Sequence, residues 1–246
     1  MKKDSRTPMT STPAETETQD EPKGIPLPPQ LIEGYADFRG NRLREEQGRF
    51  RHLADVGQKP PVLLIGCCDS RVSPEVIFDA GPGEIFVVRN IGALVPPFSI
   101  DPDPHETSAA IEYAVMALKV AHIVVMGHAQ CGGIRAFAQG QDQEYQPLSP
   151  ANFVGKWKAL IQPAADRIGP PTGDFEHYCE SLSYASIIQG IANLRTYPWL
   201  KAREDAGELS LHGAYFGVAN GNMTALDEAR GRFVPVAPPV NVRPKS

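Results

Sequence analysis

Three short apolar segments constrain the fold of this chain more than any other feature. Residues 62–65 (VLLI), 85–88 (IFVV) and 123–126 (IVVM) are each continuously apolar, and the first and third run into a glycine. Such runs, without polar alternation, are typical of strands buried on both faces, as in a parallel sheet covered by helices. Between the second and third runs, apolar residues recur at a helical spacing, at Ile111, Ala114, Val115 and Leu118. The pattern predicts an α/β fold with a central, mainly parallel β-sheet flanked by helices.

Two cysteines and a histidine follow two of these runs. Cys67 comes directly after the first, and His128 and Cys131 follow the third. Because the carboxyl ends of parallel strands meet at one edge of a sheet, where ligands of α/β proteins bind, these side chains can meet at one metal ion. Two thiolates and an imidazole suit Zn²⁺, and three protein ligands leave a fourth position open, as in catalytic zinc sites. The alternative is that the cysteines are ordinary buried residues and the histidine a loop residue.

Three linked motifs resemble a known family. The strings GCCDSRV (66–72), FVVRNI (86–91) and GHAQCGG (127–133) occur in the order typical of β-class carbonic anhydrases. The resemblance is strong over residues 59–138 and weaker beyond. It implies Zn²⁺ held by Cys67, His128 and Cys131. It also implies reversible hydration of carbon dioxide to bicarbonate and a proton, with zinc-bound hydroxide as the nucleophile.

The resemblance further assigns Asp69 and Arg71 to catalysis. A zinc ion with two thiolates and a neutral imidazole is formally neutral, so it acidifies its water less than a three-histidine site does, and neighbouring groups must help. Asp69 would orient the nucleophile by accepting its hydrogen bond, and Arg71 would keep that carboxylate ionised through a bidentate pair. The alternative is an ordinary loop salt bridge of little energetic value.

Substrate contacts are implied by the same resemblance, in part across a subunit boundary. Carbon dioxide has no net dipole, so its pocket should be mainly apolar with one or two donors. The residues at the corresponding positions are Gln58, Phe86, Ile91, Tyr113 and Gly132. Plain core packing is an equally good interpretation of Phe86, Ile91 and Tyr113, and Gln58 could be a solvated loop residue.

One departure from the family bears on regulation. Members that bind bicarbonate at an inhibitory site carry a Trp three residues before the first Cys, the Arg of the R-N motif, and a late Tyr. This chain keeps Arg89 but has Leu64 and Phe216 at the other two positions, and Tyr215 falls on the opposite face of its strand. We therefore expect no such inhibitory site, and a metal that keeps water as its fourth ligand near neutral pH.

Composition restricts the partners and the compartment. The net charge is −5, with 29 acidic and 24 basic residues and no basic stripe, so nucleic acid is not an expected partner. No apolar run approaches the roughly 20 residues needed to span a bilayer, so no membrane partner is expected, and the first residues lack the apolar region of a signal peptide. Four cysteines, two of them assigned to metal, indicate a reducing compartment, for which the cytoplasm is the simplest choice. Cys68 is expected to fill space in the core.

The chain is expected to fall into four parts. These are a disordered tail (1–25), an N-terminal helical arm (26–56), an α/β zinc-binding catalytic domain (57–235) and an extended C-terminal tail (236–246). In the family such an arm lies across a neighbouring subunit, so the resemblance implies a dimer or higher even oligomer. The alternative is an arm packed on its own domain.

Beyond the metal motifs the sequence predicts further elements. Helices are expected over 153–168 and 178–199, with Pro198 ending the second. The alternating run 209–218, followed by Asn220 and Gly221, predicts an antiparallel strand and a turn at the edge of the sheet.

Three other functions stay open at this point. A hydrolase acting on carbon disulfide or carbonyl sulfide could use the same metal core. A non-catalytic protein that binds bicarbonate or zinc would not need the Asp69–Arg71 pair. A structural zinc protein or thiol redox enzyme would require a fourth protein ligand, and no free Cys or His stands at a matching spacing.

Overall fold

The computed structural model describes residues 27–100, 106–140 and 147–236, so the two expected tails lie almost wholly outside the described residues. The chain divides into two compact units, residues 1–48 and 49–246. Helix α1 spans Pro29–Gly40 and α2 spans Arg42–Val56, which confirms the expected helices of the arm. The unit boundary falls inside α2, and neither helix buries a side chain.

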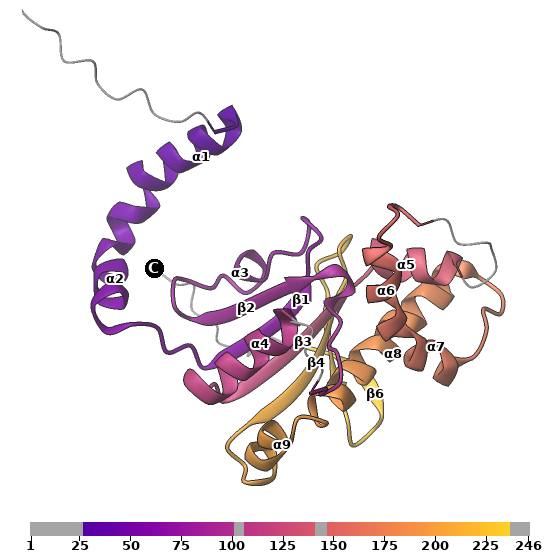
Figure 1. Cartoon of the computed structure of the whole chain (residues 1–246). Coiled ribbons are helices and arrows are strands. Elements are labelled where there is room, and N and C mark those ends of the chain that lie inside the picture. The colour runs from indigo at the N-terminus through magenta and orange to yellow at the C-terminus, as the bar shows by residue number, and fades with distance from the viewer. Residues whose placement is uncertain (1–26, 101–105, 141–146, 237–246) are drawn as a thin grey trace, which may run out of the picture. The chain divides into compact units, whose positions relative to one another are not determined.

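A six-stranded sheet forms the centre of the larger unit (Figure 1). The strands are β1 (Val62–Cys67), β2 (Ile85–Asn90), β3 (His122–His128), β4 (Ser210–Phe216), β5 (Met223–Asp227) and β6 (Arg232–Pro235). Their order is β2-β1-β3-β4-β5-β6, with β2 to β4 parallel and β5 and β6 antiparallel. The predicted fold class is confirmed.

The prediction that residues 209–218 form the edge strand is wrong. Strand β4 lies between β3 and β5 and pairs in parallel with β3 over its whole length. The turn at Asn220 and Gly221 reverses the chain and places β5 on the outer side of β4, and β6 then forms the edge. The alternating sequence of residues 209–218 gave no information about which strands flank this one.

Helices cover one face of the sheet with the main hydrophobic core. Leu63 and Ile65 point to this face, and Leu64 points to the other, where the buried cluster is smaller. The covering elements are α4 (Glu106–Glu112), the π-helical turn η2 (Tyr113–Ala117), α8 (Phe175–Leu194) and α9 (Pro198–Asp205). The predicted helical stripe at Ile111, Ala114, Val115 and Leu118 is buried in this core, which confirms it.

Two glycines let α8 approach the sheet closely. A Cβ at Gly127 of β3 would lie 2.8 Å from Cδ1 of Ile187, and one at Gly213 of β4 would lie 2.8 Å from Cγ2 of the same residue. Ile187 is buried in the core. Helix α8 therefore packs directly against the backbone of β3 and β4, at the residue that precedes His128.

The prediction that Pro198 ends a helix is also wrong. Helix α8 ends at Leu194, and Pro198 is the first residue of α9. Proline suits the first helical turn because its missing N–H has no partner there in any case. The remaining elements are α3 (Pro74–Ile77), η1 (Ile91–Ala93), α5 (Gly132–Gln139), α6 (Phe153–Lys158), η3 (Ala159–Ile161) and α7 (Gln162–Ile168). Among the described residues, no helix combines the length and apolar character that crossing a membrane requires.

Candidate metal centre

The three predicted metal ligands meet at the carboxyl edge of the sheet. Cys67 is the last residue of β1 and His128 the last of β3, and these strands are parallel neighbours. Cys131 immediately precedes α5. All three side chains are buried, their ligand atoms lie within 4.8 Å of one another, and the two Sγ atoms are 3.9 Å apart.

One ring nitrogen of His128 is left without a partner. Its Nδ1 lies 2.9 Å from the carbonyl oxygen of Ala129, which fixes Nδ1 as the N–H donor. Nε2 therefore carries a lone pair, and it is buried with no hydrogen-bond partner among the described residues. A buried polar atom without a partner is rare in proteins, and a metal ion at this position would satisfy it.

The thiols of Cys67 and Cys131 carry one negative charge and one proton between them. Because the sulfur atoms are in contact, the pKa of Cys67 is lowered and that of Cys131 is raised, as expected for two groups that hold one proton between them. Backbone N–H groups of Gly133 and Ile134, in the first turn of α5, act in the opposite direction and lower the pKa of Cys131. A cation is needed to hold both as thiolates.

The donor set fits Zn²⁺ with an open position. Two sulfurs and one imidazole nitrogen are ligands that zinc prefers. Within the described part of the chain, the only cluster of potential metal ligands is Cys67, His128 and Cys131, so no fourth protein ligand closes the site. This is the arrangement of a catalytic zinc site and not of a structural one.

One peptide group connects the metal centre to α6. The N–H of Gly92 donates to Sγ of Cys67 at 3.4 Å, and the carbonyl of the same peptide, that of Ile91, accepts from Nε1 of Trp157 at 2.8 Å. The φ angle of +84° at Gly92 strongly favours glycine. Trp157 thus holds the peptide that donates to a metal ligand.

Asp69 and Arg71 form the predicted pair beside the ligands. Nε and Nη2 of Arg71 donate to the two carboxylate oxygens of Asp69 at 2.9 and 2.7 Å, and the backbone N–H of Arg71 adds a third bond at 3.0 Å. These bonds hold the pKa of the Asp69 carboxyl well below its usual range. Its Oδ2 lies 4.0 Å from Nε2 of His128, so an anion faces the metal position.

Arg89 fixes the backbone that carries these groups. Its guanidinium donates to the carbonyl oxygens of Cys67 at 2.8 Å and of Asp69 at 2.7 Å. Arg71 also donates to the carbonyl of Gln130, which joins the pair to the loop between His128 and Cys131. The R-N motif marked Arg89 in the sequence, but no pattern revealed which atoms it binds.

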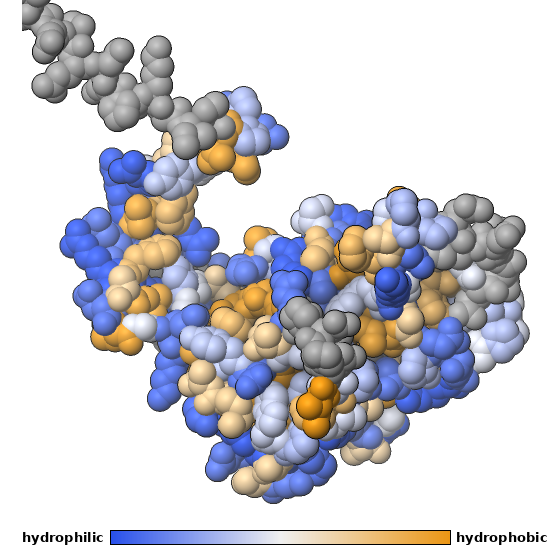
Figure 2. All heavy atoms as spheres, viewed as in Figure 1, coloured by the Kyte–Doolittle hydropathy of each residue, from blue (hydrophilic) through white to orange (hydrophobic). Residues whose placement is uncertain are grey.

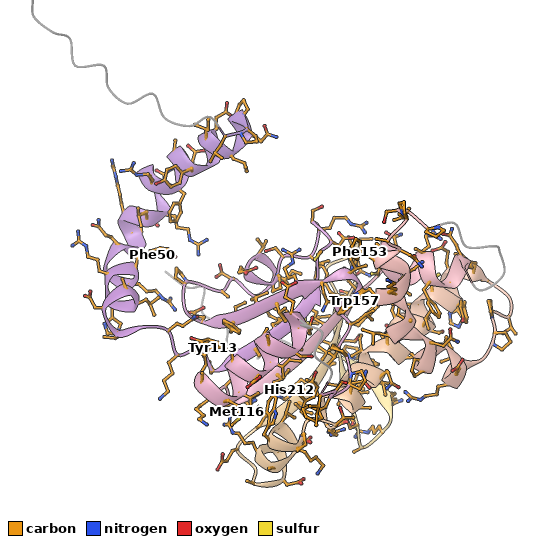
Figure 3. The ribbon with its side chains drawn as sticks, viewed as in Figure 1. Phe50, Tyr113, Met116, Phe153, Trp157 and His212 are labelled. Carbon is orange, nitrogen blue, oxygen red and sulfur yellow. The ribbon has the colours of Figure 1, made fainter. Side chains whose placement is uncertain are left out.

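A cavity of about 330 Å³ lies next to this centre. It is mainly apolar, and its lining comprises Cys68, Arg89, Asn90, Ile91, Glu106, Thr107, Phe153, Val154 and Trp157. Figure 3 labels Phe153 and Trp157, the first and fifth residues of α6. Sequence reasoning missed these α6 residues because they stand far from the metal motifs in the chain.

The predicted substrate residues are placed differently from one another. Ile91 lines the cavity, whereas Phe86 and Tyr113 pack together with ring centroids 5.8 Å apart. Gln58 is exposed, and a Cβ added at Gly132 would meet open space. Within the described chain, the structure therefore unites Phe86 with Tyr113 but does not bring all five residues into one cavity.

The expectation that Cys68 fills space in the core is wrong. Its side chain is exposed and lines the cavity. Successive residues of an extended backbone point to opposite sides, so Cys67 and Cys68 cannot both face the metal.

The fold and the site together define an α/β protein with an open Cys₂His metal centre at the carboxyl edge of its parallel strands. The family model for carbonic anhydrase matches residues 62–223 of this chain. The chain belongs to the β-carbonic anhydrase family.

Individual relatives agree with this assignment. The carbonic anhydrase of Pseudomonas aeruginosa is 35% identical over 218 residues, which cover 87% of this chain and 94% of that protein. Beta carbonic anhydrase 5, chloroplastic, of Arabidopsis thaliana is 35% identical, and its match covers 74% of this chain but only 59% of the relative. The solved structure of the β-carbonic anhydrase CcaA is similar with a TM-score of 0.75 and 32% identity, covering 84% of this chain and 98% of that one. A tetrameric β-carbonic anhydrase of Sordaria macrospora is similar with a TM-score of 0.67 and 27% identity, covering 85% of this chain and 98% of its own.

Proposed function

We propose that this protein catalyses the reversible hydration of carbon dioxide to bicarbonate and a proton. The observation that carries the proposal is the open Cys₂His donor set with an ionised carboxylate beside it. Zn²⁺, held by Cys67, His128 and Cys131, would supply a Lewis acid that lowers the pKa of a bound water.

Asp69 is proposed to orient the attacking oxygen. As an anion it can only accept a hydrogen bond, so it aligns the O–H of the nucleophile and leaves a lone pair free for the carbon atom. Arg71 prevents Asp69 from rotating or taking up a proton, because it binds both carboxylate oxygens. Arg89 holds the backbone between Cys67 and Asp69, which fixes the carboxylate relative to the thiol of Cys67.

The substrate is proposed to approach over apolar side chains. Ile91 belongs to the cavity beside the metal centre, and Phe86 packs with Tyr113 at the neighbouring strand and helix. In the assembled protein, we propose that a partner subunit supplies part of this pocket and that Gln58 donates to a substrate oxygen. Gly132, where no side chain fills the space, would leave room for carbon dioxide.

We further propose a dimer or a higher even oligomer, located in the cytoplasm. Leu31, Ile32 and Tyr35 of α1 are 57, 48 and 59% exposed, which is unfavourable unless another surface covers them. Figure 2 shows apolar residues among charged ones along α1 and α2. A neighbouring subunit is the proposed cover for this arm, and a monomer in light scattering would contradict the proposal.

The metal is proposed to keep its fourth position open to water. Arg89 uses its guanidinium on two backbone carbonyls, and Leu64 and Phe216 replace the other two residues of the family's inhibitory bicarbonate site. A crystal structure near neutral pH with Asp69 bound to the metal would contradict this part of the proposal.

Two variants test the reaction and the separate roles of its residues. Cys67→Ser should lose zinc and activity together, whereas Asp69→Asn should retain zinc and lose the rate of carbon dioxide hydration measured by stopped flow. Cys179→Ser and Asp166→Asn, at a half-buried thiol and an exposed carboxylate outside the metal centre, are matched controls and should keep both. If the zinc-loaded wild-type protein hydrated carbon dioxide no faster than buffer alone, the proposed enzyme activity would be refuted.

A hydrolase of carbon disulfide or carbonyl sulfide is the second candidate, because the same donors and carboxylate would serve it. The stopped-flow comparison of these substrates with carbon dioxide separates the two reactions. A non-catalytic bicarbonate or zinc-binding protein would bind its ligand and accelerate neither reaction.

A further inference from the structure

Two histidines meet at the opposite end of the sheet from the metal centre. His122 is the first residue of β3, and His212 lies on β4, the parallel neighbour of β3 (Figure 3 labels His212). Nε2 of His212 lies 3.3 Å from Nδ1 of His122, and the ring centroids are 5.3 Å apart at an angle of 55°. Both side chains are exposed, so an ion can reach them.

The separation of the nitrogens agrees with joint metal ligation. Two nitrogens bound to one tetrahedral Zn²⁺ at 2.0–2.1 Å are about 3.3–3.4 Å apart. A good N–H···O hydrogen bond has its heavy atoms about 2.9–3.0 Å apart, so 3.3 Å is long for a hydrogen bond between these rings. Both rings are at the surface, so each can rotate about its χ2 angle. Such rotations can turn the lone pairs of Nε2 of His212 and Nδ1 of His122 toward an ion that lies beside the line joining these two nitrogens.

The charges near the pair keep His212 available as a ligand. Partial shielding of the ring from water and the neighbouring His122 lower the pKa of His212, while Glu228 acts in the opposite direction. Both carboxylate oxygens of Glu228 are bound by Arg195, at 2.8 and 3.0 Å, so this acid does not form a close pair with the histidines. A neutral imidazole is the form that binds a metal.

We propose that His122 and His212 form a second site for a divalent transition-metal ion of the zinc type, completed by water. This site is separate from the catalytic centre, because His122 and His128 are the first and last residues of β3 and about 20 Å apart along the strand. An ion bound here joins β3 to β4 and stabilises the folded state, since the unfolded chain does not hold the two rings together.

The test is a titration of the zinc-loaded full-length protein with further Zn²⁺. The wild type should bind about one additional ion per chain, and its melting temperature should rise with Zn²⁺ concentration. His122→Gln and His212→Gln should each weaken this additional binding at least tenfold and remove the rise. His177→Gln, at an exposed histidine on α8, is the matched control and should behave as the wild type.

Two further readouts keep the result independent of the proposed enzyme activity. The zinc retained after dialysis should be the same in all four proteins, because the catalytic ligands are intact. With Cu²⁺ as the probe, electron paramagnetic resonance should show coupling to two imidazole nitrogens in the wild type and to at most one in each variant. No additional ion in the wild type, or undiminished binding in His212→Gln, would overturn the proposal and leave the pair as a hydrogen bond only.

Discussion

Replacing Gly127 by alanine tests how closely helix α8 must approach the sheet. The new Cβ would lie 2.8 Å from Cδ1 and 3.0 Å from Cγ1 of Ile187, closer than packed carbons can come. Overpacking of this kind costs about 1–3 kcal/mol. The backbone at Gly127 does not have a positive φ, so alanine regains about 0.4–1 kcal/mol by restricting the unfolded chain. We expect a net loss of about 1–2 kcal/mol, which lowers the melting temperature by about 2–8 °C in a domain of this size.

A double-mutant cycle isolates the contact. Ile187→Ala alone should cost about 2–5 kcal/mol, because it leaves a cavity in the core. In the double variant the added methyl group fills part of that cavity, so the combined loss should fall short of the sum by about 1–2 kcal/mol. The assay is urea denaturation at one fixed zinc concentration. Gly132→Ala, where a Cβ meets open space, is the stability control and should cost little.

The same substitution should affect the metal centre, because the strained residue directly precedes a metal ligand. Gly127→Ala should weaken zinc binding in a chelator competition, and Ile187→Ala should restore part of it. Additive free energies of unfolding, within about 0.5 kcal/mol, would refute the claim that α8 rests on the backbone of β3 through this contact.

Three further predictions concern hydrogen bonds and charge. Arg71→Lys keeps the positive charge but loses the two-point bond to the carboxylate, so kcat/KM should fall about tenfold with zinc content unchanged; a normal rate would show that charge alone suffices. Trp157→Phe keeps an aromatic ring but loses the indole N–H that holds the peptide donating to Cys67. Zinc binding should therefore weaken about tenfold, and the absorption spectrum of the Co²⁺-substituted protein should shift. Unaltered zinc binding and an unaltered spectrum would contradict this prediction. Arg195→Gln should destabilise the protein by about 1 kcal/mol near neutral pH, a value reduced by its partial exposure. Arg195 lowers the pKa of Glu228 below the ordinary 4.5. The stability that this pair contributes is therefore present above pH 4.5 and is lost as the pH falls through the lowered pKa. The free energies of unfolding of the wild type and the variant should converge in acid.

The sequence was sufficient where the signal is local. The continuous apolar runs identified β1, β2 and β3, and the stripe through Ile111 identified the buried face of α4 and η2. The spacing of Cys67, His128 and Cys131 after strand ends led to one metal centre, because parallel strands end at a common edge. Each of these inferences needs only the periodicity of the backbone and one rule of topology.

The main omissions involve neighbours that are distant in the chain. The internal position of β4 depends on where β5 and β6 pair. The break before Pro198 is a different kind of error, because proline at the first position of a helix is a local signal that was assigned to the wrong helix. The cavity that Cys68 lines depends on α6, which contributes Phe153, Val154 and Trp157. No window of residues contains such information.

The sequence by itself determined the class of fold, the family and the candidate metal ligands, because these follow from local apolar patterns and short motifs. Only the tertiary structure decided which peptide Trp157 holds against Cys67, how closely Ile187 lies to Gly127, and that His122 and His212 meet. These relations are distances across the packed core and sheet, and packing brings together side chains whose separation along the chain carries no periodic signal.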